Sequence, residues 1–275
     1  MTIPRRKNKQ PAEKATVSRA FILIALQLAN RQTGFYGLVG TLPTDLTRWC
    51  YINMDIESIR NTRIGGSVQV AKDLWLFRLP KNRFRAGQSY ALQVSEGMLL
   101  IDAVHEITKP AVEKVLQVHK PVALLLTHSD LISQAFTTPQ GLAKWLDCPV
   151  YIHPHDTKDA KILSLTEGLP LMNRLGISVH HTPGHTPGSV MFYQRESKRL
   201  FAGDCAVGHN YDEAPNYFTH PPMQDNEWSL FVSAWSNFGE EVRELYPLHG
   251  KPATEIGDFH DIRQSLVTRD NVMEL

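Results

Sequence analysis

Cysteine is scarce in this sequence. Its 275 residues include three cysteines, Cys50, Cys148 and Cys205, and no two of them form a Cys-x-x-Cys pair. An odd number of cysteines without such spacing argues against a disulfide framework, and unpaired cysteines are typical of a reducing compartment. We therefore expect a cytoplasmic protein.

An excess of charge of either sign is also absent. The chain has 29 Lys and Arg against 28 Asp and Glu, which gives a formal net charge of +1. Proteins held to nucleic acid by charge usually carry a basic patch or stripe. The near balance, and the lack of a basic stretch around the motifs described below, argue against a nucleic-acid partner and against a nuclease.

A hydrophobic run long enough to cross a bilayer is missing near the N-terminus. The apolar run at residues 20–29 has about half the length required. It follows a basic stretch at residues 5–9 and so mimics a secretory signal, but Asn30-Arg31-Gln32-Thr33 is a poor cleavage site. We expect a disordered basic tail, then a helix, and no membrane partner, with a secretory signal as the alternative.

The first part of the chain carries no motif. Gly65-Gly66 is a credible domain boundary, so we divide the chain into an N-terminal extension, residues 1–66, and a main domain, residues 67–275. The extension could cover one edge of the main fold, narrow the access to a site, or pair with a second copy to form a homo-oligomer. The residues do not choose among these roles.

What the main domain does contain is a set of apolar segments that each end in a histidine or an aspartate at a rigid turn. These segments are VALLLTHSD at 122–130, TPGHTPGS at 182–189, FAGD at 201–204 and YPLHGKP at 246–252. They deliver His128, Asp130, His185, Asp204 and His249. Proline and glycine fix the backbone of such turns, and side chains delivered from distant segments can build a metal site.

The order of these motifs resembles the metallo-β-lactamase fold superfamily over roughly Val68 to Thr254. In that family His185, Asp204 and His249 fall at the positions of the third histidine, the bridging aspartate and the last histidine. The resemblance implies an α+β fold, a four-layer αββα sandwich with the metal at one rim between two sheets. It also implies a branch close to glyoxalase II and the general metallo-hydrolases.

The chain departs from the family at its signature loop, Thr-His-x-His-x-Asp-His. Here the sequence reads Thr127-His128-Ser129-Asp130-Leu131-Ile132-Ser133, so the motif is degenerate. Without a gap, Asp130 takes the place of the second histidine, and Ile132 and Ser133 replace the Asp-His pair. With a two-residue deletion, Asp130 is the family's aspartate and both neighbouring histidines are lost. We favour the deletion, because it keeps the following apolar residue in register.

The remaining ligands suffice for fewer metals than the family binds. Two complete sites need about three protein ligands each, with one carboxylate shared. His128, Asp130, His185, Asp204 and His249 suit one divalent metal, with Zn²⁺ as the first choice and Fe²⁺ or Mn²⁺ as alternatives. A site without metal is a further alternative. The family's chemistry implies that Asp130 orients or deprotonates the attacking water, and that His249 binds a second metal or stabilises an oxyanion.

Two functions follow from these residues. The first is a metal-dependent hydrolase of a small thioester, ester or lactone, because the motif spacing is closest to the glyoxalase II branch. The second is a pseudoenzyme that keeps the fold for binding or assembly, since the densest ligand cluster has lost two histidines. In the second case His185, Asp204 and His249 would persist as hydrogen-bonding partners at the rim.

Other polar residues near the motifs are expected to have structural roles and not to bind metal. His153-Pro154-His155 has the appearance of a metal-binding tripeptide, but its place directly after Val150-Tyr151-Ile152 favours an ordinary polar strand exit. Asp102, at the end of an apolar run, is expected to orient a ligand histidine. The side chain of Cys205 is expected to point away from that of Asp204. Strands are predicted at 122–126 and 150–152, and helices at 108–119, 138–146 and 225–244.

Overall fold

The computed structural model describes residues 56–81, 85–159, 162–212, 217–223 and 227–269. The predicted basic tail and the helix that follows it lie outside the described residues, as does Cys50. The extension's role and its boundary at residue 66 therefore stay predictions. Helix α2 (Ile56–Asn61) is described, and its Ile59 is fully buried in the core of the main domain. No helix in the described ranges combines the length and apolar character that crossing a membrane requires.

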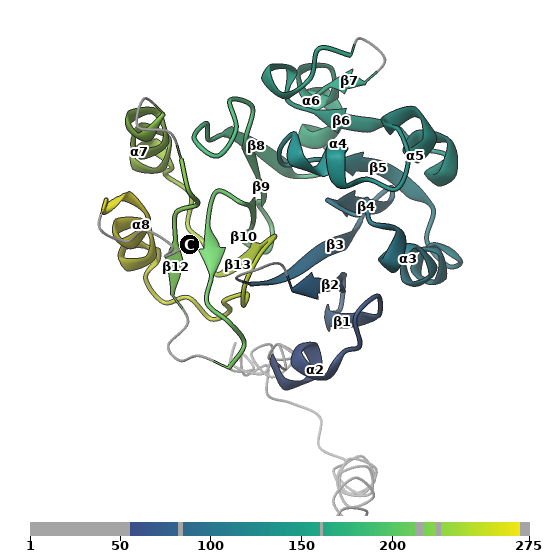
Figure 1. The fold of residues 1–275 in the computed structure, drawn as a ribbon, viewed down its shortest axis with the longest axis horizontal. Coiled ribbons are helices and arrows are strands. Elements are labelled where there is room, and N and C mark those ends of the chain that lie inside the picture. The colour runs from purple at the N-terminus through teal and green to yellow at the C-terminus, as the bar shows by residue number, and fades with distance from the viewer. Residues whose placement is uncertain (1–55, 82–84, 160–161, 213–216, 224–226, 270–275) are drawn as a thin grey trace, which may run out of the picture. The chain divides into compact units, whose positions relative to one another are not determined.

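A seven-stranded sheet forms one half of the fold (Figure 1). Its strands, in their order across the sheet, are β1 (Ser67–Ala71), β2 (Leu74–Lys81), β3 (Ala86–Val94), β4 (Gly97–Ile101), β5 (Pro121–Leu125), β6 (Val150–Ile152) and β7 (Leu163–Ser164). Strands β1 to β4 pair antiparallel, and β4 to β7 pair parallel. The sheet therefore changes from hairpins to crossovers at β4.

A four-stranded sheet forms the other half, in the order β13-β10-β9-β8. Its strands are β8 (Ile177–His181), β9 (Val190–Gln194), β10 (Arg199–Gly203) and β13 (Glu244–Pro247). Strands β10 and β13 are parallel, and β9 is antiparallel to both β8 and β10. The carboxyl ends of β8, β10 and β13 thus share one edge of this sheet. A small two-stranded sheet pairs β11 (Val207–Gly208) with β12 (Phe218–Thr219).

Helices cover the outer faces of both sheets (Figure 1). Along the chain they are α3 (Lys109–Leu116), α4 (Asp130–Gln134), α5 (Pro139–Leu146), α6 (Leu165–Arg174), α7 (Trp228–Asn237) and α8 (Phe259–Val267), with 3₁₀ turns η2 (Glu106–Thr108) and η3 (Pro154–Asp156). In Figure 1, α7 and α8 lie on the left beyond β12, and α3 and α5 lie on the right beyond β4 and β5.

Three groups of buried side chains separate the layers. One group joins the two sheets, with Tyr90 and Leu125 from the first and Phe201 and Tyr246 from the second. Another lies between the seven-stranded sheet and helices α3 and α5, and a third lies between the four-stranded sheet and helices α7 and α8. Helix, sheet, sheet and helix follow one another, which confirms the predicted four-layer αββα sandwich.

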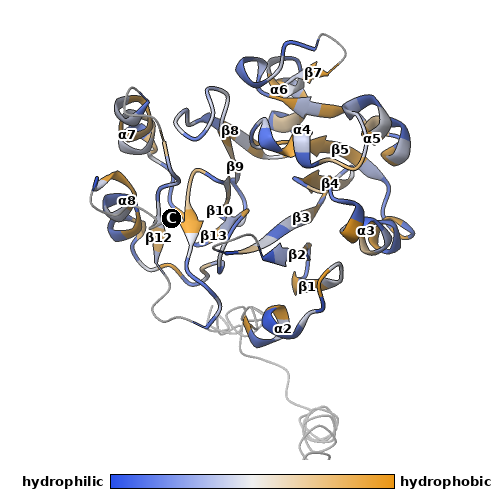
Figure 2. Ribbon diagram, viewed as in Figure 1, coloured by the Kyte–Doolittle hydropathy of each residue, from blue (hydrophilic) through white to orange (hydrophobic). Residues whose placement is uncertain are grey.

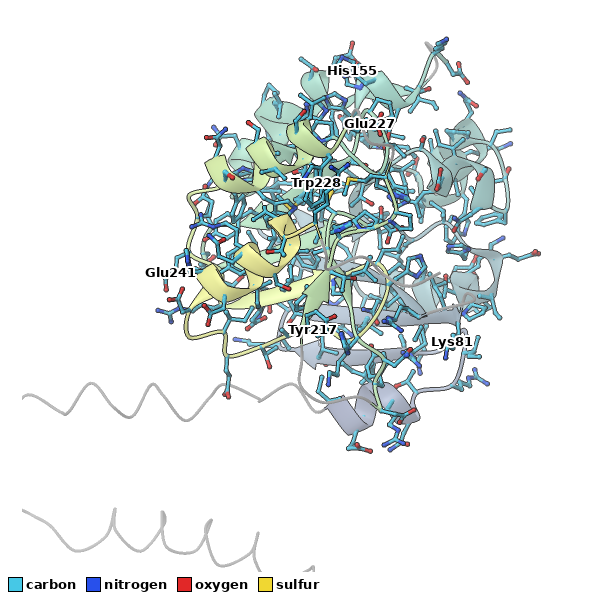
Figure 3. All side chains as sticks on the ribbon, turned by 60° about the vertical axis from the view of Figure 1, so that its left-hand side comes forward. Lys81, His155, Tyr217, Glu227, Trp228 and Glu241 are labelled. Carbon is cyan, nitrogen blue, oxygen red and sulfur yellow. The ribbon has the colours of Figure 1, made fainter. Side chains whose placement is uncertain are left out.

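Hydropathy explains why these segments occupy the inner layers. Strand β6 is buried at all three positions, and β5 is buried at its last three, as expected for parallel strands covered on both faces. Figure 2 shows hydrophobic colour along β4 and β5, whereas the outer helices have one hydrophobic and one hydrophilic side. Charged side chains such as Lys81 and Glu241 are exposed and point outward in Figure 3.

The predicted long helix at 225–244 is wrong in its extent. Helix α7 ends at Asn237, and Phe238 takes an extended conformation. Phe238 is 3% exposed and packs on Trp235 and Phe259, so its burial turns the chain out of the helix. The acidic residues that follow favour a helix by propensity, but the chain must cross to β13, which begins at Glu244.

The loop after β13 is joined to the first sheet. The backbone N–H of Gln88 donates to Leu248 O at 2.9 Å, and Gly250 N–H donates to Ala86 O at 2.9 Å. The side-chain amide of Gln88 and the hydroxyl of Tyr90 both donate to Pro247 O. These bonds bring the end of the four-stranded sheet against the start of β3.

Candidate metal centre

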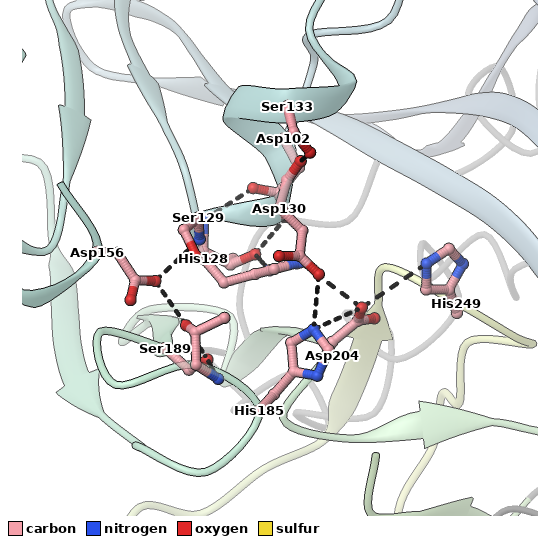
Figure 4. A network of polar contacts seen from close by, with 12 residues as sticks. Asp102, His128, Ser129, Asp130, Ser133, Asp156, His185, Ser189, Asp204 and His249 are labelled. Atoms are coloured by element: carbon pink, nitrogen blue, oxygen red, sulfur yellow. Dashed lines mark hydrogen bonds and ion pairs between the residues drawn. The ribbon is translucent and has the colours of Figure 1, made fainter. Parts of the chain in front are cut away.

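Four strands of the two sheets carry the predicted site residues to one rim (Figure 4). His128 follows β5, and Asp130 is the first residue of α4. His185 lies in the loop between β8 and β9, Asp204 follows directly after β10, and His249 follows β13. The structure brings all five side chains together.

Asp204 is the centre of this group. Its Oδ2 lies 3.6 Å from the Nε2 atoms of both His128 and His185, and 3.7 Å from Nε2 of His249. The side chain of His128 is 2% exposed, that of Asp204 is 11% exposed, and those of His185 and His249 are each 18% exposed. One carboxylate oxygen therefore faces three imidazole nitrogens in a largely buried setting.

Asp130 approaches the group from the solvent side. Its Oδ2 lies 3.4 Å from His185 Nε2, and its side chain is 52% exposed. Ligand atoms of His128, Asp130 and His185 all lie within 4.8 Å of one another. Figure 4 shows the Asp130 carboxylate directed toward His185 and Asp204, whereas Ser133 lies on the far side of Asp130.

A hydrogen-bond path fixes the orientation of His128. The Thr127 hydroxyl donates to Asp102 Oδ2 at 2.9 Å, and its oxygen lies 2.9 Å from His128 Nδ1. The hydroxyl of Thr127 donates its one proton to Asp102, so toward His128 its oxygen can only accept. His128 Nδ1 must therefore carry the proton and donate it to Thr127 Oγ1. The lone pair of the neutral ring is then at Nε2, which faces Asp204. This path agrees with the orienting role predicted for Asp102.

Asp156 holds two of the ligand loops together. Its Oδ2 accepts from Ser129 N–H at 2.9 Å and from the Thr186 hydroxyl at 2.6 Å, and its Oδ1 accepts from Gly188 N–H at 2.6 Å. Ser129 adjoins His128, and Thr186 adjoins His185. One carboxylate thus sets the spacing of loops that come from different sheets.

The pKa values of the residues in this group shift in different directions. Burial lowers the pKa of His128 and outweighs the opposing effect of Asp204. Burial also opposes charge on His185, but the contact with Asp130 and the charge of Asp204 raise the pKa of His185 overall. That same contact lowers the pKa of Asp130. Burial raises the pKa of Asp102 to about 7. The hydrogen bonds from the N–H and the hydroxyl of Thr127 lower this pKa, but their effect is smaller than that of burial.

The contact distances fit ligands around a cation better than hydrogen bonds. The separations of 3.4 to 3.7 Å exceed those of ordinary N–H···O bonds. Ligand atoms about 2.0–2.1 Å from a tetrahedral metal lie about 3.3 Å apart. Asp204 Oδ1 and His185 Nε2, both beside the proposed metal position, are buried and have no hydrogen-bond partner among the described residues. The donor set and these unpaired atoms fit a divalent metal.

Residues next to Asp130 do not reach the group. Leu131 is fully buried in the core between the first sheet and its helices, and Ile132 packs against that core. The hydroxyl of Ser133 donates to the backbone oxygen of Asp130 at 2.7 Å. Cys205 is 1% exposed, and its thiol contacts Thr182 O at 3.7 Å, in agreement with a side chain turned away from Asp204.

Sequence patterns missed two residues beside the group. Asp156 was visible only as the end of the tripeptide segment, because its partners are backbone N–H groups that tertiary structure brings together. His105 was not singled out; burial lowers its pKa, and the charge of His249 lowers it further. An acidic residue three positions after the strand-exit histidine, His153, was the available signal for Asp156.

Comparison with known proteins agrees with this geometry. Residues 140–235 match the metallo-beta-lactamase superfamily. A relative from Bacillus subtilis (strain 168), described as probable metallo-hydrolase YybB, is 24% identical over 185 residues, which are 58% of this chain and 76% of that protein. The crystal structure of a metallo beta lactamase from Erythrobacter litoralis has a TM-score of 0.52 at 15% identity, and covers 74% of this chain and 95% of its own.

Proposed function

We propose that the chain is a metal-dependent hydrolase of the metallo-beta-lactamase superfamily whose site holds one divalent metal; the match of residues 140–235 to that superfamily and the relative described as a probable metallo-hydrolase support this. The observation that carries the proposal is the position of Asp204 Oδ2, with the Nε2 atoms of His128 and His185 each at 3.6 Å. Without a cation, the Nε2 lone pair of a neutral His128 and the carboxylate would repel each other. A shared metal turns this repulsion into attraction.

His128, Asp130, His185 and Asp204 are the ligands that we assign. Asp130 lies with His128 and His185, which supports the ungapped alignment, in which it replaces the second histidine, over the deletion. Two imidazoles and two carboxylates suit Zn²⁺, and also Fe²⁺ and Mn²⁺. The positions that would complete a second metal site are held by Ile132 and Ser133, which supply no ligand.

His249 lies on the other side of Asp204 from Asp130 (Figure 4). Its Nε2 is 3.7 Å from Asp204 Oδ2 and is joined to no second carboxylate by the contacts described. We assign it to the developing oxyanion of the substrate, to which it donates an N–H. Its position is fixed by the bonds between its loop and β3, which include those of Leu248 and Gly250.

When bound, the metal acts as a Lewis acid that acidifies its water ligand and polarises the scissile carbonyl. The residues of the chain supply the rest. Asp130 is half exposed and ionised at neutral pH, since His185 lowers its pKa, so it can accept the proton of an attacking water. Asp102 and Thr127 hold His128 in one tautomer, and Asp156 holds the loops of His128 and His185 in register.

Small thioesters, esters and lactones are the substrates that we propose. The support is the similarity of the TPGHTPGS and PLHGKP segments to those of the glyoxalase II branch. The relative described as a probable metallo-hydrolase supports the reaction class, without a substrate. The near-neutral chain supports a small-molecule substrate over a nucleic acid.

The test combines elemental analysis with a hydrolysis assay. Protein purified without chelator should contain about one divalent metal per chain and should hydrolyse activated thioesters, esters or lactones. Chelation should abolish hydrolysis, and Zn²⁺, Fe²⁺ or Mn²⁺ should restore it. His185→Asn should hold one divalent metal per chain fewer than the wild type and lose activity, while His260→Asn, which alters an exposed histidine at the start of α8, should match the wild type in both.

The alternative is a pseudoenzyme. It is supported by Ile132 and Ser133, which supply no metal ligand at the positions of the family's Asp-His pair. A pseudoenzyme would hydrolyse no member of the substrate panel, and after loading with any of the three ions it would bind no more metal than its His185→Asn variant. In that case Asp204 and the histidines would serve as polar partners at the rim.

A further inference from the structure

A second group of histidines lies outside the metal centre described above. It consists of His153, His155 and His181, whose ligand nitrogens all lie within 4.8 Å of one another. The ring of His153 stacks on that of His181 with a centroid separation of 4.1 Å, and the ring of His155 meets that of His153 edge-on at 4.8 Å. We call these three residues the outer histidine cluster.

The outer histidine cluster joins the two sheets at their surface. His153 follows β6 of the seven-stranded sheet, and His155 lies in the turn η3 that comes next. His181 is the last residue of β8 in the four-stranded sheet. His155 and His181 are exposed and His153 is half-buried. Figure 3 shows His155 at the periphery of the molecule.

Hydrogen bonds leave the ring of His181 ready to act as a ligand. Its Nε2 lies 2.8 Å from Pro187 O and can only donate to that carbonyl, so the lone pair of the neutral ring is at Nδ1. A ligand histidine usually donates its other N–H to a carbonyl or carboxylate in this way. The Nδ1 of His153 accepts only a long bond, 3.3 Å, from His155 N–H, which a metal can replace.

The neighbouring carboxylate does not contribute a ligand. Both oxygens of Asp156 accept hydrogen bonds from the two loops of the metal centre. The outer histidine cluster thus offers three nitrogens and an open side toward solvent. Nitrogen donors favour Zn²⁺, Ni²⁺ and Cu²⁺ over Mg²⁺, Ca²⁺ and Mn²⁺, which prefer oxygen.

We propose that His153, His155 and His181 bind one divalent transition-metal ion, separate from the metal centre at Asp204. Stacked rings do not aim their lone pairs at one point, so binding requires the rings to rotate. The exposure of His155 and the long bond of His153 permit these two rings to rotate, while His181 keeps its bond to Pro187 O. Because His181 donates to Pro187, two residues from His185, the ion also restrains the loop that carries His185.

The test is a count of bound metal. The full chain is stripped with chelator, dialysed against micromolar Ni²⁺ or Zn²⁺, and analysed for metal per chain. His155→Asn and His181→Gln are compared with the wild type; the glutamine amide can still donate to Pro187 O. His260→Asn serves as the control, since it removes an exposed histidine elsewhere.

We expect each cluster variant to bind one ion per chain fewer than the wild type, and the control to match the wild type. The result is the difference in bound metal between variant and wild type, so it tests the outer histidine cluster whether or not the site at Asp204 binds metal. Equal counts in the wild type and both variants would overturn the proposal. So would a loss in one variant alone, because a three-histidine site needs both residues.

Discussion

Asp156 shows how a residue that touches no reacting atom can determine the geometry of a site. It accepts three hydrogen bonds from groups in two ligand loops, and two of these donors are backbone N–H groups. Hydrogen bonds to a charged acceptor contribute about 1.5–3 kcal/mol each, more than those between neutral groups. The spacing between His128 and His185 therefore depends on a carboxylate outside the ligand set.

Asp156→Asn is expected to weaken metal binding. Its amide keeps one acceptor oxygen and places an NH₂ group against the N–H of Ser129 or Gly188, so at least one donor loses its partner. We expect about a 10- to 100-fold loss in metal affinity and a loss of about 2 kcal/mol in the free energy of unfolding. Competition with a chromogenic chelator and denaturant unfolding measure the two.

Asp212→Asn is the matched control, because Asp212 is exposed and pairs only with Arg60 among the contacts described. Both quantities should stay near the wild-type values in this control. If Asp156→Asn lost stability but bound metal as tightly as the wild type, Asp156 would support the fold without positioning the ligands.

Asp102 gives a pH dependence whose sign can be worked out. Its pKa is about 7 in the folded protein, against an ordinary value of 3.8, because the carboxyl is buried. The folded state therefore holds a proton that the unfolded state has released. This contribution to stability is fully present below about pH 4 and is lost as the pH rises through 7, by at most about 1.4 kcal/mol per pH unit.

We expect metal-free Asp102→Asn to lack this decline. Asparagine can still accept the Thr127 N–H and can donate to the Thr127 hydroxyl oxygen, so the geometry is preserved. Urea unfolding of chelated wild type and variant between pH 4 and 8 gives two curves, whose difference isolates Asp102 from the titrating histidines. Parallel curves would show that Asp102 is ionised in the fold throughout this range.

At the scale of elements, the path of helix α4 gives a reason for the second metal site that we propose to be missing. Helix α4 begins at Asp130, so residues 131 to 133 follow a helical path from the site. Leu131 then faces the core, and Ser133 faces outward near Asp130. The ungapped alignment assigns Ile132 and Ser133 to the missing Asp-His pair, and the start of α4 is where that pair would be presented.

The double variant Ile132→Asp/Ser133→His should therefore bind one more ion per chain than the wild type, as measured by elemental analysis after dialysis of both against Zn²⁺. Leu131→His is the contrasting variant. It places an imidazole in a fully buried apolar position, so it should lower stability without adding metal. The reverse pattern, with metal gained only in Leu131→His, would support the deletion alignment.

The sequence predicted elements best where one physical factor dominates. Continuous apolar runs predicted β5 and β6, and the convergence of strand exits predicted which five side chains meet. The length of α7 was mispredicted. Helix propensity near Glu240 and Glu241 is a local property, whereas α7 ends at Asn237 because Phe238 is buried by tertiary packing. Asp156 could not be assigned, since its role depends on backbone groups from two loops that meet only in the folded chain.

At the scale of the whole molecule, the metal centre lies across the interface of the two sheets. His128 and Asp130 follow a strand of the seven-stranded sheet, whereas His185, Asp204 and His249 follow strands of the four-stranded sheet. A bound ion therefore links both halves of the sandwich. Its binding free energy contributes directly to the stability of the native state.

Removal of metal should lower the midpoint of thermal unfolding. At a free metal concentration 100 times Kd, the ion stabilises the native state by about 2.7 kcal/mol. The wild type should lose this stabilisation on chelation and regain it with Zn²⁺, as measured by calorimetry. Asp204→Asn should lose most of the Zn²⁺-dependent shift that the wild type shows; a shift as large as that of the wild type would place the stabilising ion elsewhere, for example at the outer histidine cluster.

The bonds between β3 and the loop after β13 have a consequence for the order of folding. The side-chain amide of Gln88 reaches Pro247 O and Gly250 O across sequence separations of 159 and 162 residues. Closing so long a loop is slow, and His249 reaches its place only when the loop has closed. During synthesis the group around Asp204 stays incomplete until the segment that carries His249 has emerged. The ligands His128, His185 and Asp204 come from both sheets, so an ion that they hold would stabilise the native state and not a transition state in which the sheets are not yet joined. Metal should therefore slow unfolding and leave the refolding rate unchanged.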